Sequence, residues 1–146
     1  MRARYAGSSL MRILLAEDNP VNQMVAIKLL AKDGHHVKVA TTGLEAVQAW
    51  EHESFDLILM DEQMPSMDGV EAVKQIRRRE LENGAKRTAI VALTASAMKG
   101  DRERFLAAGM DGYLAKPFTS EELYAAIRHG ISSAANVNQH EFPQIG

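Results

Sequence analysis

Five short apolar runs alternate with longer amphipathic stretches along the chain. The runs are nearly unbroken and most are rich in Leu or β-branched residues; they are residues 13–16, 37–40, 57–60, 89–93 and 112–115. Runs of this kind are typical of strands that are buried on both faces of a parallel sheet. We therefore predict five strands that belong to one sheet.

The stretches between these runs carry the signals that begin and end helices. Asn19 can cap a helix whose first residue is Pro20, and Gly34 is expected to end it. Similar C-terminal signals for later helices are Gly109 and Gly130. The face of the first helix that helical spacing predicts to be buried consists of Val21, Met24, Ile27 and Ala31.

Five strands that alternate with five helices predict an α/β protein. The expected architecture is a doubly wound, flavodoxin-like (βα)5 fold, in which a five-stranded parallel sheet is covered by helices on both faces. We expect residues 11–131 to form this domain, and residues 1–10 to be a leader or linker. Helical periodicity is lost from residue 134, so we expect 132–146 to be a tail or linker.

Composition narrows the classes of protein further. The chain has 146 residues, which suits one domain, and its net charge of −2 argues against nucleic-acid binding. The basic cluster Arg77–Arg79 is expected to be a solvated helix face. The absence of cysteine excludes disulfides, thiolate nucleophiles and cysteine-based zinc sites. No apolar run approaches the roughly 20 residues of a membrane span, so we expect no membrane contact by this segment and a cytoplasmic location.

Polar residues follow four of the five apolar runs. They are Glu17 and Asp18 after the first, Asp61 after the third, Thr94 after the fourth and Lys116 after the fifth. In open α/β sheets, ligands bind outside the carboxyl ends of the strands. We therefore expect these five side chains to converge at one edge of the sheet.

Three neighbouring carboxylates repel one another unless a cation lies between them or one stays protonated. Oxygen ligands without His or Cys suit a hard ion, and Mg²⁺ is the first candidate. Asp61 stands alone and is the best nucleophile, whereas the adjacent Glu17 and Asp18 are better metal ligands. Lys116 supplies a cation for a phosphate oxygen and Thr94 a hydroxyl, so the set describes a phosphoryl site. Taken singly, each residue also has a plain structural interpretation, such as a helix cap or a surface lysine.

Four segments of the chain resemble the receiver domain of two-component response regulators. They are "RILLAEDNPVNQ", "LILMDEQMPSMDG", "IVALTA" and "DGYLAKPF", and the resemblance covers roughly residues 11–130. The segments "AEDNPVNQ" and "MDEQMPSMDG" are most similar to those of receivers of hybrid sensor histidine kinases. A stand-alone response regulator is the alternative that we keep.

The resemblance implies a role for each polar residue in a phosphorelay. Asp61 would accept a phosphoryl group from a phosphohistidine on a histidine kinase or a histidine phosphotransfer domain. Glu17, Asp18, Asp61 and the backbone carbonyl of Gln63 would hold Mg²⁺, and Lys116 would bind a phosphoryl oxygen. Such a domain promotes its own phosphorylation and dephosphorylation without being a dedicated enzyme, while the parent chain could be a histidine kinase.

The resemblance also implies a switch that carries the signal away from the site. Thr94 would bond the phosphoryl group, and Tyr113 would then rotate inward. This movement would remodel the face made by the fourth helix, fifth strand and fifth helix, where a downstream protein or a second copy of the chain could dock. The Lys116–Pro117 peptide bond is expected to be cis.

Glu62 follows the expected acceptor directly. Because side chains alternate along a strand, we expect Glu62 to point away from Asp61 and to lie outside the site. Adjacent His35 and His36 are expected to face opposite sides for the same reason, so they do not form a metal site.

Two further functions share parts of this pattern. A haloacid-dehalogenase-like phosphatase also uses an Asp nucleophile at a strand end, but it requires a second Asp two residues later, where this chain has Gln63. A flavodoxin-like cofactor binder requires a phosphate-cradling loop after the first strand, and "AEDNPVN" offers acids instead.

Overall fold

Five strands and five helices alternate in the computed structural model, which describes residues 10–95, 98 and 100–141, with side chains to residue 138. The strands are β1 (Arg12–Ala16), β2 (His36–Ala40), β3 (Leu57–Asp61), β4 (Ala89–Thr94) and β5 (Gly112–Ala115). The helices are α1 (Pro20–Ala31), α2 (Gly43–His52), α3 (Gly69–Asn83), α4 (Asp101–Ala108) and α5 (Ser120–Glu141). Each predicted apolar run lies inside one strand, so the predicted alternation is confirmed.

All strand pairs in the sheet are parallel, in the order β2-β1-β3-β4-β5. The chain passes from β1 to one side to form β2, and then to the other side to form β3. The carboxyl ends of β1 and β3 therefore flank the point where the strand order reverses, which is where open α/β sheets bind ligands. Every residue of the central strand β3 is buried.

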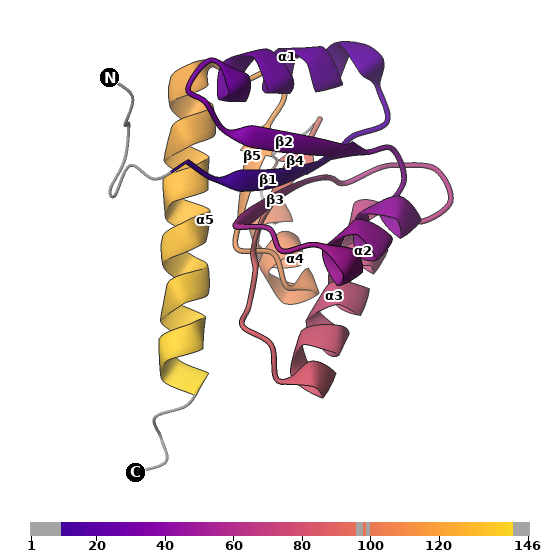
Figure 1. Ribbon diagram of the computed structural model, residues 1–146, viewed down its shortest axis with the longest axis vertical. Helices are drawn as coiled ribbons and strands as arrows, with labels where there is room; N and C mark the ends of the chain where they lie inside the picture. Colours follow the sequence, from indigo (N-terminus) through magenta and orange to yellow (C-terminus); the bar gives the residue numbers. More distant parts are fainter. Residues whose placement is uncertain (1–9, 96–97, 99, 142–146) are drawn as a thin grey trace.

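Helices cover both faces of this sheet (Figure 1). On one face, α2, α3 and α4 pack on side chains such as Ile58 and Met60. On the other face, α1 and α5 pack on the alternate positions, including Leu57 and Leu59. The two apolar layers explain why the strands read as continuous apolar runs, and the doubly wound fold is confirmed.

The predicted buried face of α1 is wrong. Val21 and Met24 are 68% and 60% exposed, whereas Ala26 and Leu30 are buried against the sheet. Apolar residues lie on several sides of this helix, so their spacing could not identify the side that packs. The N-terminal prediction is confirmed, because the Asn19 side chain accepts hydrogen bonds from the backbone N–H groups of Val21 and Asn22.

The C-terminal helix is longer than the sequence predicts, because α5 continues to Glu141. Gly130 does not end it: a Cβ there would lie 2.7 Å from Val91 Cγ2, so glycine allows α5 to pack closely on β4. The last turns are anchored by Ala134, which is buried, and by Asn138, whose Oδ1 accepts from the Arg87 backbone N–H at 2.8 Å. The predicted loss of helical structure from residue 134 is therefore wrong.

The division into segments 1–10, 11–131 and 132–146 stays a prediction, and 1–9 and 142–146 lie outside the described residues. Among the described helices, none is both long and apolar enough to cross a membrane.

Candidate functional site

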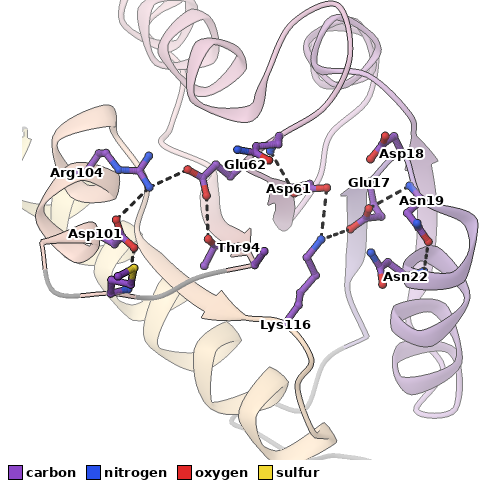
Figure 2. Close-up of a pocket in the computed structure, with 13 residues that line it drawn as sticks. Glu17, Asp18, Asn19, Asn22, Asp61, Glu62, Thr94, Asp101, Arg104 and Lys116 are labelled. Carbon is purple, nitrogen blue, oxygen red and sulfur yellow. Dashed lines mark hydrogen bonds and ion pairs between the residues drawn. The ribbon is translucent and has the colours of Figure 1, made fainter.

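A cleft of about 440 Å³ opens at the carboxyl ends of β1, β3, β4 and β5 (Figure 2). The polar residues that follow these strands all line it: Glu17, Asp18, Asp61, Thr94 and Lys116. Gln63 lines it as well. The architecture thus brings together side chains that are up to 99 positions apart in the sequence, as the Lys116–Glu17 contact shows.

The acidic residues form one compact group. Glu17, Asp18 and Asp61 each present a carboxylate oxygen within 4.8 Å of the other two. Glu17 and Asp61 are buried, whereas Asp18 lies at the exposed mouth. Oxygen ligands with open access to water suit Mg²⁺, which binds through one or two carboxylates and keeps several waters. The donor set therefore fits the predicted metal.

Lys116 bridges the two buried carboxylates. Its Nζ lies 3.2 Å from Glu17 Oε1 and 3.6 Å from Asp61 Oδ2. Its backbone N–H donates to the carbonyl of Thr94 at 2.8 Å, which ties the lysine to β4. The Lys116–Pro117 peptide bond is cis, as predicted. The ammonium group therefore lies within reach of both buried carboxylates.

The environment of Asp61 disfavours its charge. Burial, followed by the charge of Glu17, raises the pKa of Asp61 to about 6, although Lys116 and the backbone N–H of Gln63 act in the opposite direction. That N–H donates to Asp61 Oδ1 at 3.3 Å. A divalent cation bound beside this carboxylate would relieve the unfavourable charge.

Glu62 belongs to the cleft, so the prediction that it points away is wrong. Its Oε1 accepts a hydrogen bond from Thr94 Oγ1 at 2.8 Å, and its Oε2 lies 2.8 Å from Arg104 Nη2 (Figure 2). Glu62 comes after the last residue of β3, where the chain leaves the sheet. Strand alternation therefore does not determine its direction, and its long side chain reaches across to β4 and α4.

Two charged residues that line the cleft were not considered in the sequence-based prediction of the site. Arg104 and Asp101 come from α4 and form an ion pair at 3.3 Å beside Glu62. No strand-end pattern marks them, because they enter the cleft from a helix.

Tyr113 lies elsewhere. It lines a hollow of about 510 Å³ between α4, β5 and α5, and its ring centroid lies 5.9 Å from that of Phe105.

His35 and His36 also lie outside the cleft. His35 is buried and its Nδ1 accepts a hydrogen bond from the Met11 backbone N–H, whereas His36, the first residue of β2, is exposed. Within the described part of the chain, Glu17, Asp18 and Asp61 form the one group of three acidic or histidine side chains placed to hold a metal ion.

The fold and this cleft define a flavodoxin-like α/β protein. Its acidic site, bridged by Lys116, lies where the strand order of the sheet reverses. The chain belongs to the response regulator receiver domain family, whose model matches residues 13–128. The resemblance predicted from the sequence is therefore confirmed, and it places the chain in phosphorelay signalling.

Curated relatives include a hybrid signal transduction histidine kinase and a sensor protein. The chain is 46% identical over 123 residues to the hybrid signal transduction histidine kinase G of Dictyostelium discoideum, covering 82% of this chain and 4% of that protein. It is 44% identical over 112 residues to the sensor protein GacS of Pseudomonas syringae pv. syringae, covering 77% of this chain and 12% of that protein. The chain thus spans a small part of these relatives.

Solved structures show the same fold with a metal or a partner. The receiver domain of sensor histidine kinase PA1611 from Pseudomonas aeruginosa PAO1, with a magnesium ion coordinated in its active site cleft, is 44% identical with a TM-score of 0.74. The match covers 85% of this chain and 99% of that chain. A second match, 35% identical and also with a TM-score of 0.74, is to the co-crystal structure of the Saccharomyces cerevisiae histidine phosphotransfer protein Ypd1 and the receiver domain of Ssk1. This match covers 94% of the present chain and 97% of the matched chain.

Proposed function

We propose that Asp61 accepts a phosphoryl group from a phosphohistidine of a histidine kinase or a histidine phosphotransfer domain. The observation that carries this proposal is the buried Asp61 carboxylate, which shares an acidic cleft with Glu17 and Asp18 and lies 3.6 Å from the Lys116 ammonium. The arrangement combines a nucleophile, a candidate metal site and a cation for the phosphoryl oxygens.

The transfer forms one bond and breaks one bond. A carboxylate oxygen of Asp61 attacks the phosphorus as the phosphorus–nitrogen bond to the donor imidazole breaks, and the imidazole leaves with that electron pair. Lys116 binds an oxygen of the transferred group, and Thr94 donates its hydroxyl to another. Glu17, Asp18, Asp61 and the Gln63 backbone carbonyl would hold Mg²⁺, which would neutralise part of the negative charge in the cleft.

The parent protein is proposed to be a hybrid histidine kinase, because the matched segment is a small part of the hybrid signal transduction histidine kinase G of Dictyostelium discoideum. A stand-alone regulator remains the alternative, and expression of the native gene would distinguish the two by size. A phosphatase of the haloacid-dehalogenase type gains no support, because Gln63 occupies the place of its second Asp. The proposed location is the cytoplasm, which fractionation of the native host would test.

The proposed output surface is the face formed by α4, β5 and α5. Tyr113 lines the hollow on this face together with apolar side chains such as Leu106, which is 44% exposed. A downstream protein would dock there after Thr94 and Tyr113 change position. Pairing of two copies through the same face would appear as a phosphorylation-dependent increase in mass in sedimentation experiments.

Acetyl phosphate with Mg²⁺ tests the acceptor directly. Intact-mass analysis should show one added phosphoryl group in the wild type and none in Asp61→Asn. Asp68→Asn is the matched control: Asp68 caps α3 from the same loop through Glu71 N–H, and Asn caps equally well, so labelling should persist. Labelling of Asp61→Asn at the wild-type level would refute the assignment. Lys116→Ala should still bind Mg²⁺ but should lose the response of Tyr113 to phosphorylation.

A further inference from the structure

The carboxylate of Glu62 contacts side chains from both β4 and α4. One of its oxygens accepts the Thr94 hydroxyl of β4 at 2.8 Å, and the other pairs with Arg104 of α4 at 2.8 Å. The carboxylate is largely shielded, because its side chain is 18% exposed. Both oxygens of Glu62 are therefore occupied by groups from outside its own loop.

The backbone holds Glu62 in place on both sides. Its N–H donates to the carbonyl of Leu93 at 2.9 Å, and its own carbonyl accepts from the N–H of Gly69 at 2.9 Å. Glu62 is thus fixed between β4 and the start of α3, one residue after Asp61. Its contact with Thr94 follows from a constrained backbone position and not from a freely moving side chain.

Thr94 has one hydroxyl proton to donate. It can donate this proton to Glu62 or to a phosphoryl oxygen on Asp61, but not to both. We propose that Glu62 is a positioning residue that holds Thr94 and α4 in the resting arrangement, so that activation requires Thr94 to exchange the Glu62 carboxylate for the phosphoryl group. This inference rests on the proposed function of Asp61.

The ion pair between Glu62 and Arg104 connects the cleft to the proposed output face of α4, β5 and α5. The Arg104 guanidinium lies 4.5 Å from the centroid of the Phe105 ring, and that ring lies against Tyr113. A change in the Glu62–Arg104 pair therefore reaches Tyr113 through a contiguous set of contacts. The exposed Arg104, at 46%, makes the ion pair itself a weak source of stability, which suits a contact that must open.

Charge favours release of Thr94 after phosphorylation. A phosphoryl group adds about −1.5 to −2 charges in the common phosphoresidues. On Asp61 it would stand next to the Glu62 carboxylate and compete for the same donors. The resting contact thus weakens when the group that replaces it arrives.

We call the contact of Glu62 with Thr94 and Arg104 the latch. Glu62→Gln tests the latch with a near-isosteric change. Beryllofluoride with Mg²⁺, which mimics the phosphoryl group on a carboxylate, should bind the variant roughly three- to tenfold more tightly. The neutral amide oxygen of Gln is a weaker acceptor for the Thr94 hydroxyl than the carboxylate is, and it forms no ion pair with Arg104. Without the mimic, the Thr94 methyl NMR signal of the variant should move toward its position in the beryllofluoride-bound wild type. A residue with a purely structural role would leave that signal near its resting position.

Two further variants separate the latch from a simple charge effect. Asp101→Asn removes a charge from the same cleft at a residue whose carboxylate contacts Arg104 and the Met98 backbone N–H. The affinity of this variant for beryllofluoride should differ from that of the wild type by less than about twofold. In a Thr94→Val background the benefit of Glu62→Gln should disappear, because no hydroxyl remains to be released.

The outcomes distinguish the latch from the proposed function. Unchanged affinity in Glu62→Gln, or a gain that persists undiminished with Thr94→Val, would overturn the latch and leave the Asp61 assignment intact. If the wild type itself binds no beryllofluoride in the presence of Mg²⁺ and takes no label from acetyl phosphate, both proposals fall together.

Discussion

Glu17 and Asp61 share the Lys116 ammonium, yet the charge of Glu17 still raises the pKa of Asp61. Burial is the larger cause, and together they bring that pKa to about 6. The folded protein therefore holds the acceptor carboxylate in an environment that favours its neutral form. The site stores unfavourable electrostatic free energy that a cation can release.

Asp61→Asn should stabilise the protein in the absence of metal. A raised pKa means that the contribution of Asp61 to folding is favourable below the unfolded-state pKa and is lost as the pH rises through about 6. At about pH 8 the ionised carboxylate thus costs stability, and its removal should raise the free energy of unfolding by about 1–3 kcal/mol. Urea unfolding with a chelator present measures this gain.

The gain should be confined to high pH. At about pH 4 Asp61 is protonated in the folded state, so wild type and Asp61→Asn should differ by less than about 1 kcal/mol. Asp68→Asn, on the exposed side of the same loop, should leave stability nearly unchanged at both pH values. A variant that is less stable than wild type at about pH 8 would contradict the electrostatic account of Asp61.

Gly69→Ala should disturb the acceptor loop. A Cβ at this position would lie 2.1 Å from the carbonyl oxygen of Asp61, so the backbone that presents the carboxylate must move. We expect a loss of about 1–3 kcal/mol in the free energy of unfolding, together with slower labelling by acetyl phosphate. Gly112→Ala is the control, because its Cβ would meet its nearest neighbour at 3.5 Å, an ordinary contact. Equal effects of the two variants would show that the close approach at Gly69 is not limiting.

Asp111 organises a buried charge network at the opposite edge of the sheet. Its carboxylate accepts from Arg77 Nη2 at 2.8 Å, from Arg87 Nε at 2.9 Å and from the Ile90 backbone N–H at 2.9 Å, and Asp111 is 3% exposed. Asp111→Ala would leave buried donors unpaired, so we expect a loss of about 3–5 kcal/mol in urea unfolding. Lys38→Ala removes an exposed ion pair with Glu53 and should cost less than about 1 kcal/mol. A comparably small loss for Asp111→Ala would show that the network adds little.

The sequence predicted the strands and the acidic edge well, for a physical reason. Strands buried on both faces must be apolar throughout, so a polar residue at their end stands out, as Asp61 does after residues 57–60. Parallel topology then brings such ends to one edge without any knowledge of side-chain contacts.

The sequence could not predict contacts that depend on the exact placement of helices. Arg77 was expected on a solvated face, but its side chain is 12% exposed because it pairs with Asp111, which directly precedes β5. Gly130 resembled a helix end, although it permits close packing of α5 on Val91. Glu62 was misjudged because strand alternation stops at Asp61, and only the position of α4 brings Arg104 to it. Each error comes from a long-range neighbour that no local pattern encodes.

Mg²⁺ binding should depend on pH in the range where Asp61 titrates. The metal requires the ionised carboxylate, and the pKa of Asp61 without metal is about 6. Affinity measured by isothermal titration should therefore be nearly constant above about pH 7 and fall up to about tenfold for each pH unit below about 6.

Two variants assign this dependence to Asp61. Asp18→Asn should weaken Mg²⁺ binding at every pH but keep the decline below about pH 6, because Asp61 is still present. Asp61→Asn should bind weakly and lose that decline. Wild-type affinity that stays constant from about pH 7 to about pH 5 would contradict direct participation of Asp61, since a ligand that must first lose a proton cannot bind independently of pH.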